Sequence, residues 1–138
     1  MQALSTEDAH GQNTALGHQA LRDLNAGATG NNTAVGHIAG RLMSTGIQNT
    51  LIGAAAGDAL TDADDNVVVG QAALSLDTLG SQNVAIGRAA LNSQNFTTAT
   101  AARNTAVGYF AGVAISTGIQ NTLVGLSLIH ISEPTRPY

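Results

Sequence analysis

The densest group of side chains that could bind a metal ion lies in the segment Asp58–Asp65, which reads DALTDADD. Asp58, Asp62, Asp64 and Asp65 supply four carboxylates, and Ca²⁺ prefers a shell of roughly six to eight oxygen ligands. Their spacing matches neither the EF-hand loop nor the glycine- and aspartate-rich nonapeptide that binds calcium. We therefore expect a solvated acidic turn and retain these four aspartates as weak candidates for a metal site.

Two histidines occupy equivalent places in the chain. His18 and His37 each follow the glycine of a repeated pentapeptide, so they would stack on neighbouring turns of a repetitive fold. Imidazole is a common ligand of transition metals, and two stacked imidazoles would bind such an ion weakly. The opposing interpretation is a variable and exposed position. The equivalent place elsewhere in the chain holds other side chains, namely Ala54, Gln71, Arg88 and Tyr109.

No other pattern in the sequence predicts catalysis. The chain has no Cys, which excludes disulfides, thiol nucleophiles and thiolate metal sites. It also lacks the G-x-S-x-G motif of serine hydrolases and, having no Lys, the phosphate-binding G-x-x-x-x-G-K loop. We predict a protein that is not an enzyme and that uses no cofactor.

The composition predicts a thin core. Of the 138 residues, 3% are aromatic and 10% are charged, while 43% are apolar and many of these are Ala. Such small side chains suit a stack of coils better than a thick globular interior. The net charge of −4 and the absence of a basic cluster argue against nucleic acid as a partner. No apolar run approaches the roughly 20 residues of a membrane span, and residues 1–11 show no signal-peptide pattern.

All of these residues are placed by a repeated pentapeptide, which reads N-T-A-V-G at Asn32–Gly36. Successive copies are 17 residues apart, except for 19 residues from Asn13 to Asn32 and 21 residues from Asn83 to Asn104. A period of this length indicates a solenoid in which each repeat forms one coil. The copies are Asn13–Gly17, Asn32–Gly36, Asn49–Gly53, Asn66–Gly70, Asn83–Gly87, Asn104–Gly108 and Asn121–Gly125.

Three positions of the pentapeptide hardly vary. We expect the Asn at position one to hydrogen-bond from coil to coil as a ladder rather than to bind a ligand, and the Gly at position five to form a corner. Position four is always Leu, Val or Ile, and we expect it to point inward and be buried. Position one is Asn13, Asn32, Asn49, Asn66, Asn83, Asn104 and Asn121; position four is Leu16, Val35, Ile52, Val69, Ile86, Val107 and Val124; position five is Gly17, Gly36, Gly53, Gly70, Gly87, Gly108 and Gly125.

Positions two to four favour a short strand, because β-branched residues suit a pleated sheet. Side chains alternate across a strand, so position two, which is Thr or Val, would point inward with position four. Position three is also apolar and would need a second cover. The segment after each Gly favours a short helical turn or a second strand. We therefore predict a parallel β-solenoid with coils of about 17 residues.

Two segments depart from the repeat. The longest spacing contains Asn92–Arg103, which we expect to bulge as a loop, because insertions in repeat proteins form loops. The repeat stops at Gly125, and Leu126–Arg136 resembles, codon for codon, the translation of a transposon-end adapter used to prepare sequencing libraries. We expect a repeat region over residues 1–125, truncated at both ends as in a metagenomic fragment, and a non-native tail over residues 126–138. The opposing interpretation is that this tail is a genuine cap.

The repeat over residues 1–125 resembles those of phage tail-fibre and tail-spike proteins and of bacterial surface proteins related to trimeric autotransporter adhesin heads. The resemblance implies parallel β-solenoids or β-rolls, assembled as homotrimers, that serve as stiff shafts or heads on a virion tail or a bacterial cell surface. Their targets would be carbohydrate or protein receptors on a host. The 17-residue period is longer than the coil of adhesin heads, and the matching residues are structural, so no receptor-binding residue carries over.

The functional prediction is a structural repeat segment for attachment to a host surface, assembled as a homotrimer through an apolar stripe. One alternative is an ice- or polysaccharide-binding solenoid with a Thr-bearing face. An inward-pointing Thr at position two, interrupted by Val67 and Val84, argues against it. The other alternative is a non-catalytic fragment of a carbohydrate-active solenoid.

Overall fold

Each pentapeptide forms a strand at its positions two to four. The computed structural model describes residues 3–6, 11–26 and 29–127. The pentapeptide strands are β1 (Thr14–Leu16), β2 (Thr33–Val35), β3 (Thr50–Ile52), β4 (Val67–Val69), β6 (Val84–Ile86), β8 (Thr105–Val107) and β9 (Thr122–Val124). Two shorter strands lie between pentapeptides, and these are β5 (Gly80–Ser81) and β7 (Thr100–Ala101).

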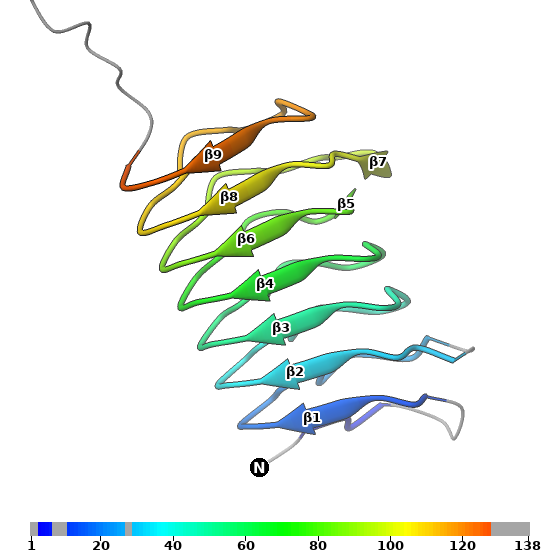
Figure 1. Cartoon of the computed structure of the whole chain (residues 1–138). Helices are drawn as coiled ribbons and strands as arrows, with labels where there is room; N and C mark the ends of the chain where they lie inside the picture. The colour runs from blue at the N-terminus through cyan, green and yellow to red at the C-terminus, as the bar shows by residue number, and fades with distance from the viewer. Residues whose placement is uncertain (1–2, 7–10, 27–28, 128–138) are drawn as a thin grey trace, which may run out of the picture.

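The pentapeptide strands stack into one seven-stranded sheet in the order β1-β2-β3-β4-β6-β8-β9 (Figure 1). Every pair is parallel and joins equivalent positions, so that Val35 pairs with Ile52 and Ile52 pairs with Val69. The predicted parallel β-solenoid with coils of about 17 residues is therefore confirmed. Position four does form one continuous column across neighbouring strands, as the sequence predicts.

The predicted burial of position four is wrong. Position three points inward instead, and in β3 Leu51 is fully buried whereas Ile52 is 39% exposed. Because side chains alternate across a strand, position two points outward together with position four. The buried column is Ala34, Leu51, Val68, Ala85 and Ala106. Position four, which is exposed or half-buried, is Leu16, Val35, Ile52, Val69, Ile86, Val107 and Val124.

Packing in the narrow interior explains this direction. Leu51 projects from the sheet into space that Gly40 leaves open on the opposite wall, since a Cβ at Gly40 would lie 2.7 Å from Leu51 Cδ1. The same Cβ would lie 2.8 Å from Leu21 Cδ2 of the preceding coil. The interior therefore accepts a leucine from one wall where the facing wall has a small residue. Position three is Ala in four coils and Leu or Val in the other three, so its size varies with the space available, whereas position four is always bulky.

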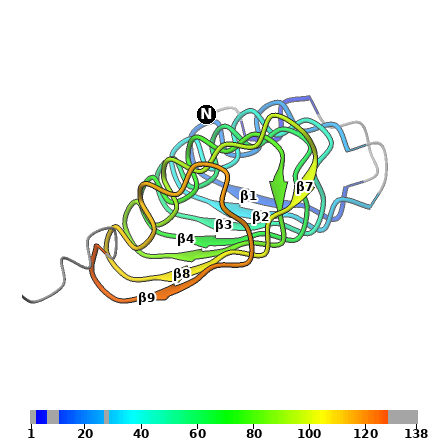
Figure 2. The ribbon, with the colours of Figure 1, turned by 90° about the horizontal axis from the view of Figure 1, so that it is seen from above.

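The return segment after each Gly is neither a helical turn nor, in most coils, a strand. Its residues alternate into the left-handed region, as at Ile38 (φ 54°) and Gly40 (φ 58°). The Ile38 N–H donates to the His18 carbonyl of the preceding coil at 2.8 Å, and the Gly40 N–H donates to the Ala56 carbonyl of the following coil at 3.0 Å. A wall of stacked turns thus faces the sheet (Figure 2). The predicted helical turn is wrong, and a second strand occurs only as the pair β5–β7 within the described residues.

The insertion Asn92–Arg103 is only partly a loop. Phe96 is almost fully buried, and Thr100–Ala101 forms β7 against β5. Residues 97–99 are exposed. The expected bulge is therefore reduced to a short exposed run, because Phe96 is buried before it and Thr100–Ala101 pairs with β5 after it.

Candidate functional site

The four aspartates of the acidic segment do not converge on one point. The Asp62 carboxylate accepts a hydrogen bond from the Thr45 hydroxyl at 2.6 Å, and Asp64 accepts one from the Ile47 N–H at 2.9 Å. Asp65 is exposed, with a φ of 58°. Within the described residues no group of three or more His, Cys, Asp or Glu is placed to hold a metal ion. The Asp62 and Asp64 carboxylates therefore bind the preceding coil of the solenoid.

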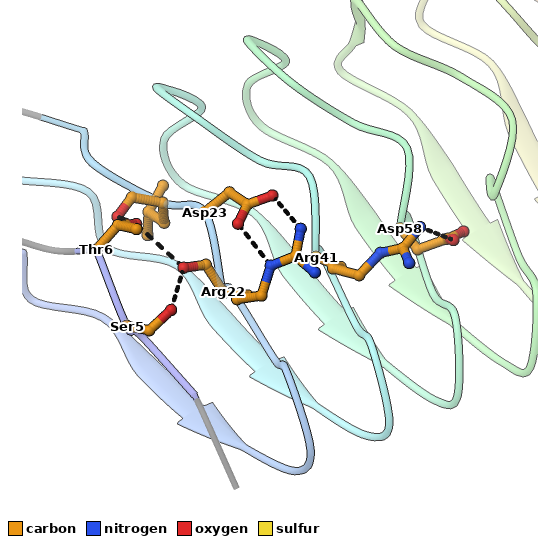
Figure 3. Close-up of polar contacts among 7 residues, drawn as sticks. Ser5, Thr6, Arg22, Asp23, Arg41 and Asp58 are labelled. Carbon is orange, nitrogen blue, oxygen red and sulfur yellow. Dashed lines mark hydrogen bonds and ion pairs between the residues drawn. The ribbon is translucent and has the colours of Figure 1, made fainter.

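Asp58, the fourth aspartate, belongs to a short row of charges on the return wall (Figure 3). Its carboxylate lies 3.8 Å from the Arg41 guanidinium, and burial raises its pKa while the Arg41 charge opposes that shift. In the adjoining coil Arg22 donates two hydrogen bonds of 2.6 Å to Asp23, which lower the pKa of Asp23. The Arg41 Nε is buried without a hydrogen-bond partner, so its pair with Asp58 is the weaker one. Both pairs are structural contacts between neighbouring residues or coils.

The position-one asparagines form a buried ladder. The Asn32 Oδ1 accepts hydrogen bonds from the Asn49 backbone N–H at 2.8 Å and from its Nδ2 at 3.1 Å. The Asn49 Nδ2 also donates to the Ala63 carbonyl at 2.7 Å, which ties the strand to the turn of its own coil. The pattern continues from Asn49 to Asn66 at 3.0 Å. Because these amides satisfy one another and are inaccessible, they hold the coils together and are not a ligand site.

The position-five glycines are explained by close approach of adjacent coils. At Gly53 the φ is +132°, and a Cβ would lie 2.7 Å from the carbonyl carbon of Gly70. Any side chain at this position would push neighbouring strands apart. The Gly column therefore has a structural role along the whole stack.

The outward face of the sheet lies outside this internal packing and carries several exposed apolar side chains. We define it as the residues at positions two and four of the seven pentapeptide strands. Among them Leu16 is 63% exposed, Ile52 39%, Val67 39%, Ile86 37% and Val124 68%. The face carries Thr, Val, Ile and Leu and no charged residue. Seven strands at about 4.8 Å spacing make this apolar stripe close to 30 Å long.

Mostly polar residues border the outward face on both sides, and Ala54 and Leu126 are the apolar members of these borders. One rim is the residue that precedes each pentapeptide, and the other, at position six, is the residue that follows its Gly; both columns are exposed. At position six Arg88 donates to the Gln71 Oε1 at 2.8 Å and to the Tyr109 hydroxyl at 3.0 Å. The first rim is Gln12, Asn31, Gln48, Asp65, Gln82, Arg103 and Gln120, and the second is His18, His37, Ala54, Gln71, Arg88, Tyr109 and Leu126. An apolar centre within a polar rim is the anatomy of a protein–protein interface.

The outward direction of position two removes one of the two arguments against a Thr-bearing binding face. Thr33 and Thr50 lie on the outward face, so they do not point into the core as expected. Val67 and Val84 still interrupt the threonine column in the middle of the sheet. A hydroxyl-bearing face therefore exists at both ends of the stack.

A buried polar cluster near the insertion escaped the sequence reasoning. The Asp77 carboxylate is fully buried and accepts hydrogen bonds from the Gly80 N–H at 3.1 Å, the Phe96 N–H at 3.0 Å and the Gln94 Nε2 at 2.6 Å. The Gln94 Oε1 accepts in turn from the Asn104 Nδ2 at 2.7 Å. The sequence does carry a signal for this cluster, because polar residues replace apolar ones at one position of the repeat. Asp77 and Gln94 occupy equivalent places in consecutive coils, and the other coils have an apolar residue there, namely Leu24, Met43, Leu60 and Ile115.

Comparison with known proteins gives no further assignment. No helix in the described part of the chain is long and apolar enough to cross a membrane. The chain matches no protein-family model, no curated protein and no solved structure.

Proposed function

We propose that this chain is a non-enzymatic structural segment of a phage tail fibre or a bacterial surface adhesin, forming a stiff shaft or head that attaches to a host surface through a carbohydrate or protein receptor. The observation that supports it is the outward face, an uncharged and largely apolar stripe along a stack of coils. Such a stripe on an elongated repeat protein serves assembly better than catalysis. The resulting location is a virion tail or the outer surface of a bacterium.

The proposed assembly is a parallel homotrimer with the outward faces of three chains on the common axis. Cyclic symmetry brings equivalent columns together, so that Ile52 of each chain meets the same column of its neighbours. The polar rims then surround the contact, and the stacked turns of the return wall face solvent. Burial of partly exposed side chains such as Ile52 and Ile86 contributes roughly 25 cal/mol per Å² of apolar surface.

Light scattering coupled to size-exclusion chromatography tests this assembly. The unchanged chain should have the mass of three chains at micromolar concentration, and Ile52→Asp should have the mass of one chain while keeping its circular dichroism spectrum. Leu76→Asp is the matched control, because Leu76 is 53% exposed but lies outside the outward face; this variant should remain trimeric. A monomeric mass for the unchanged chain, with a cooperative unfolding transition, would rule the trimer out.

The outward threonines support a second candidate function, binding to ice or to an insoluble polysaccharide. Thr33 and Thr50 offer hydroxyl and methyl groups at regular spacing. Replacing both with Val, as found naturally at Val67 and Val84, removes the hydroxyls and keeps the apolar surface. Loss of ice-growth inhibition or polysaccharide binding in this variant would favour the second function. An unchanged trimer that binds neither material would favour the first.

A further inference from the structure

Two stacked histidines lie on the rim of the outward face. His18 and His37 occupy position six of consecutive coils, beside β1 and β2, and both are exposed. Their ring centroids are 5.3 Å apart and the ring planes differ by 13°. Among the described residues neither imidazole takes part in a hydrogen bond or an ion pair. We propose that His18 and His37 form a two-imidazole site for a divalent transition metal ion such as Cu²⁺, Ni²⁺ or Zn²⁺.

The backbone holds the two side chains in fixed register. The Gly36 N–H donates to the Leu16 carbonyl at 2.8 Å on one side of the pair, and the Ile38 N–H donates to the His18 carbonyl at 2.8 Å on the other. Neighbouring strands of a sheet lie about 4.8 Å apart. Two nitrogens bound to one metal at about 2.0–2.1 Å must lie no more than about 4 Å from each other. The rings are stacked in the structure, so binding requires these exposed side chains to rotate until one nitrogen of each lies within that distance, while the backbone stays in register.

The chemistry of the pair determines which ions fit and how tightly. Imidazole is a suitable ligand for Cu²⁺, Ni²⁺ and Zn²⁺. Among these ions, Cu²⁺ should bind most tightly. No third His, Cys, Asp or Glu among the described residues joins the pair, so water completes the coordination shell. A metal binds the neutral imidazole, so acid must release it. The site is therefore an open, reversible one.

Isothermal titration of the full, tag-free chain with Cu²⁺ or Ni²⁺ alone tests the proposal. One ion per chain should bind, and His37→Ala should weaken binding at least tenfold. The matched control is the double variant His37→Ala/Gln48→His, which restores the number of histidines but places the new one on the opposite rim. It should not regain the affinity. Equal binding by His37→Ala, or recovery in the double variant, would overturn the proposal.

Two further variants test whether the ion binds His18 and His37 rather than another histidine of the chain. His10→Ala/His130→Ala should bind as the unchanged chain does, and loss of binding there would assign the ion to another site. Ala54 occupies the next coil in the same column and is exposed, so Ala54→His should add a third ligand and tighten binding at least tenfold. Failure of Ala54→His to tighten binding would also count against the site. The proposal does not depend on the trimer, because both ligands come from one chain.

Discussion

Leu51 and Ile52 are neighbours in β3, yet they serve different purposes. Leu51 fills the space left by Gly40 and is fully buried, whereas Ile52 is 39% exposed on the outward face. The same division applies along the stack, since position three makes the core and position four makes the surface. A substitution at position three therefore acts on folding, and one at position four acts on assembly.

Leu51→Ala should lower the free energy of unfolding by about 2–5 kcal/mol, because it removes a buried side chain and leaves a cavity. Ile52→Ala should lower it by less than about 1 kcal/mol in the separated chain, because its side chain is already in contact with water. Urea denaturation under conditions that keep both variants monomeric gives both values. Equal losses for the two variants would contradict the assigned strand direction.

The buried carboxylate of Asp77 anchors the insertion between β6 and β8 through hydrogen bonds. Asp77 accepts hydrogen bonds from both Gly80, in β5, and Phe96, in the insertion. β5 and β7 pair beside this contact. Three residues of the insertion, 97–99, remain exposed. The loop is therefore short and anchored, although the insertion itself is longer.

Asp77→Leu should release this element. Leucine fits the column, where Leu60 already lies, but it leaves the N–H groups of Gly80 and Phe96 and the Gln94 amide without their acceptor. Each unsatisfied buried group costs about 1–3 kcal/mol. Limited proteolysis should show faster cleavage at residues 97–99. Leu60→Met, a change in the same column away from the insertion, should leave cleavage unchanged; equal protection of all three proteins would show that Asp77 does not anchor the loop.

At the scale of the whole molecule, the described coils form a one-dimensional stack in which each strand of the seven-stranded sheet contacts its immediate neighbours. Its stability is therefore close to a sum of coil and interface contributions. The Asn ladder, the Gly column and the in-register strands repeat from coil to coil. The described stack ends with β9, and residues 128–138, which contain most of the predicted non-native tail, lie outside the described residues.

Removal of residues 128–138 should leave the thermal midpoint within about 2 °C of the full chain, a change of less than about 1 kcal/mol. The reason is that the repeat pattern ends at Gly125. Removal of residues 109–138 provides the contrast. It also removes β9 and the Ala111 carbonyl that accepts from the Leu91 N–H, so the midpoint should fall clearly. A large loss from the shorter deletion would show that the tail is a genuine cap.

Much of this architecture is readable from the sequence because it depends on repetition. The period places one strand in each coil, and the unvarying Asn and Gly follow from contacts that every coil makes with the next. Equivalent residues must then form columns, so the stacking of His18 on His37 is also predictable. None of these inferences requires knowledge of how the chain closes around its interior.

The inward direction of the strand, by contrast, was decided only by the tertiary structure. Both faces of β3 are apolar, so alternation alone does not say whether Leu51 or Ile52 is buried. The choice depends on the opposite wall, where Gly40 leaves room for a leucine of the next coil. That wall is built from left-handed turns, which ordinary helix and strand preferences do not predict. The outward face and its rims could therefore be recognised only once both walls were in place.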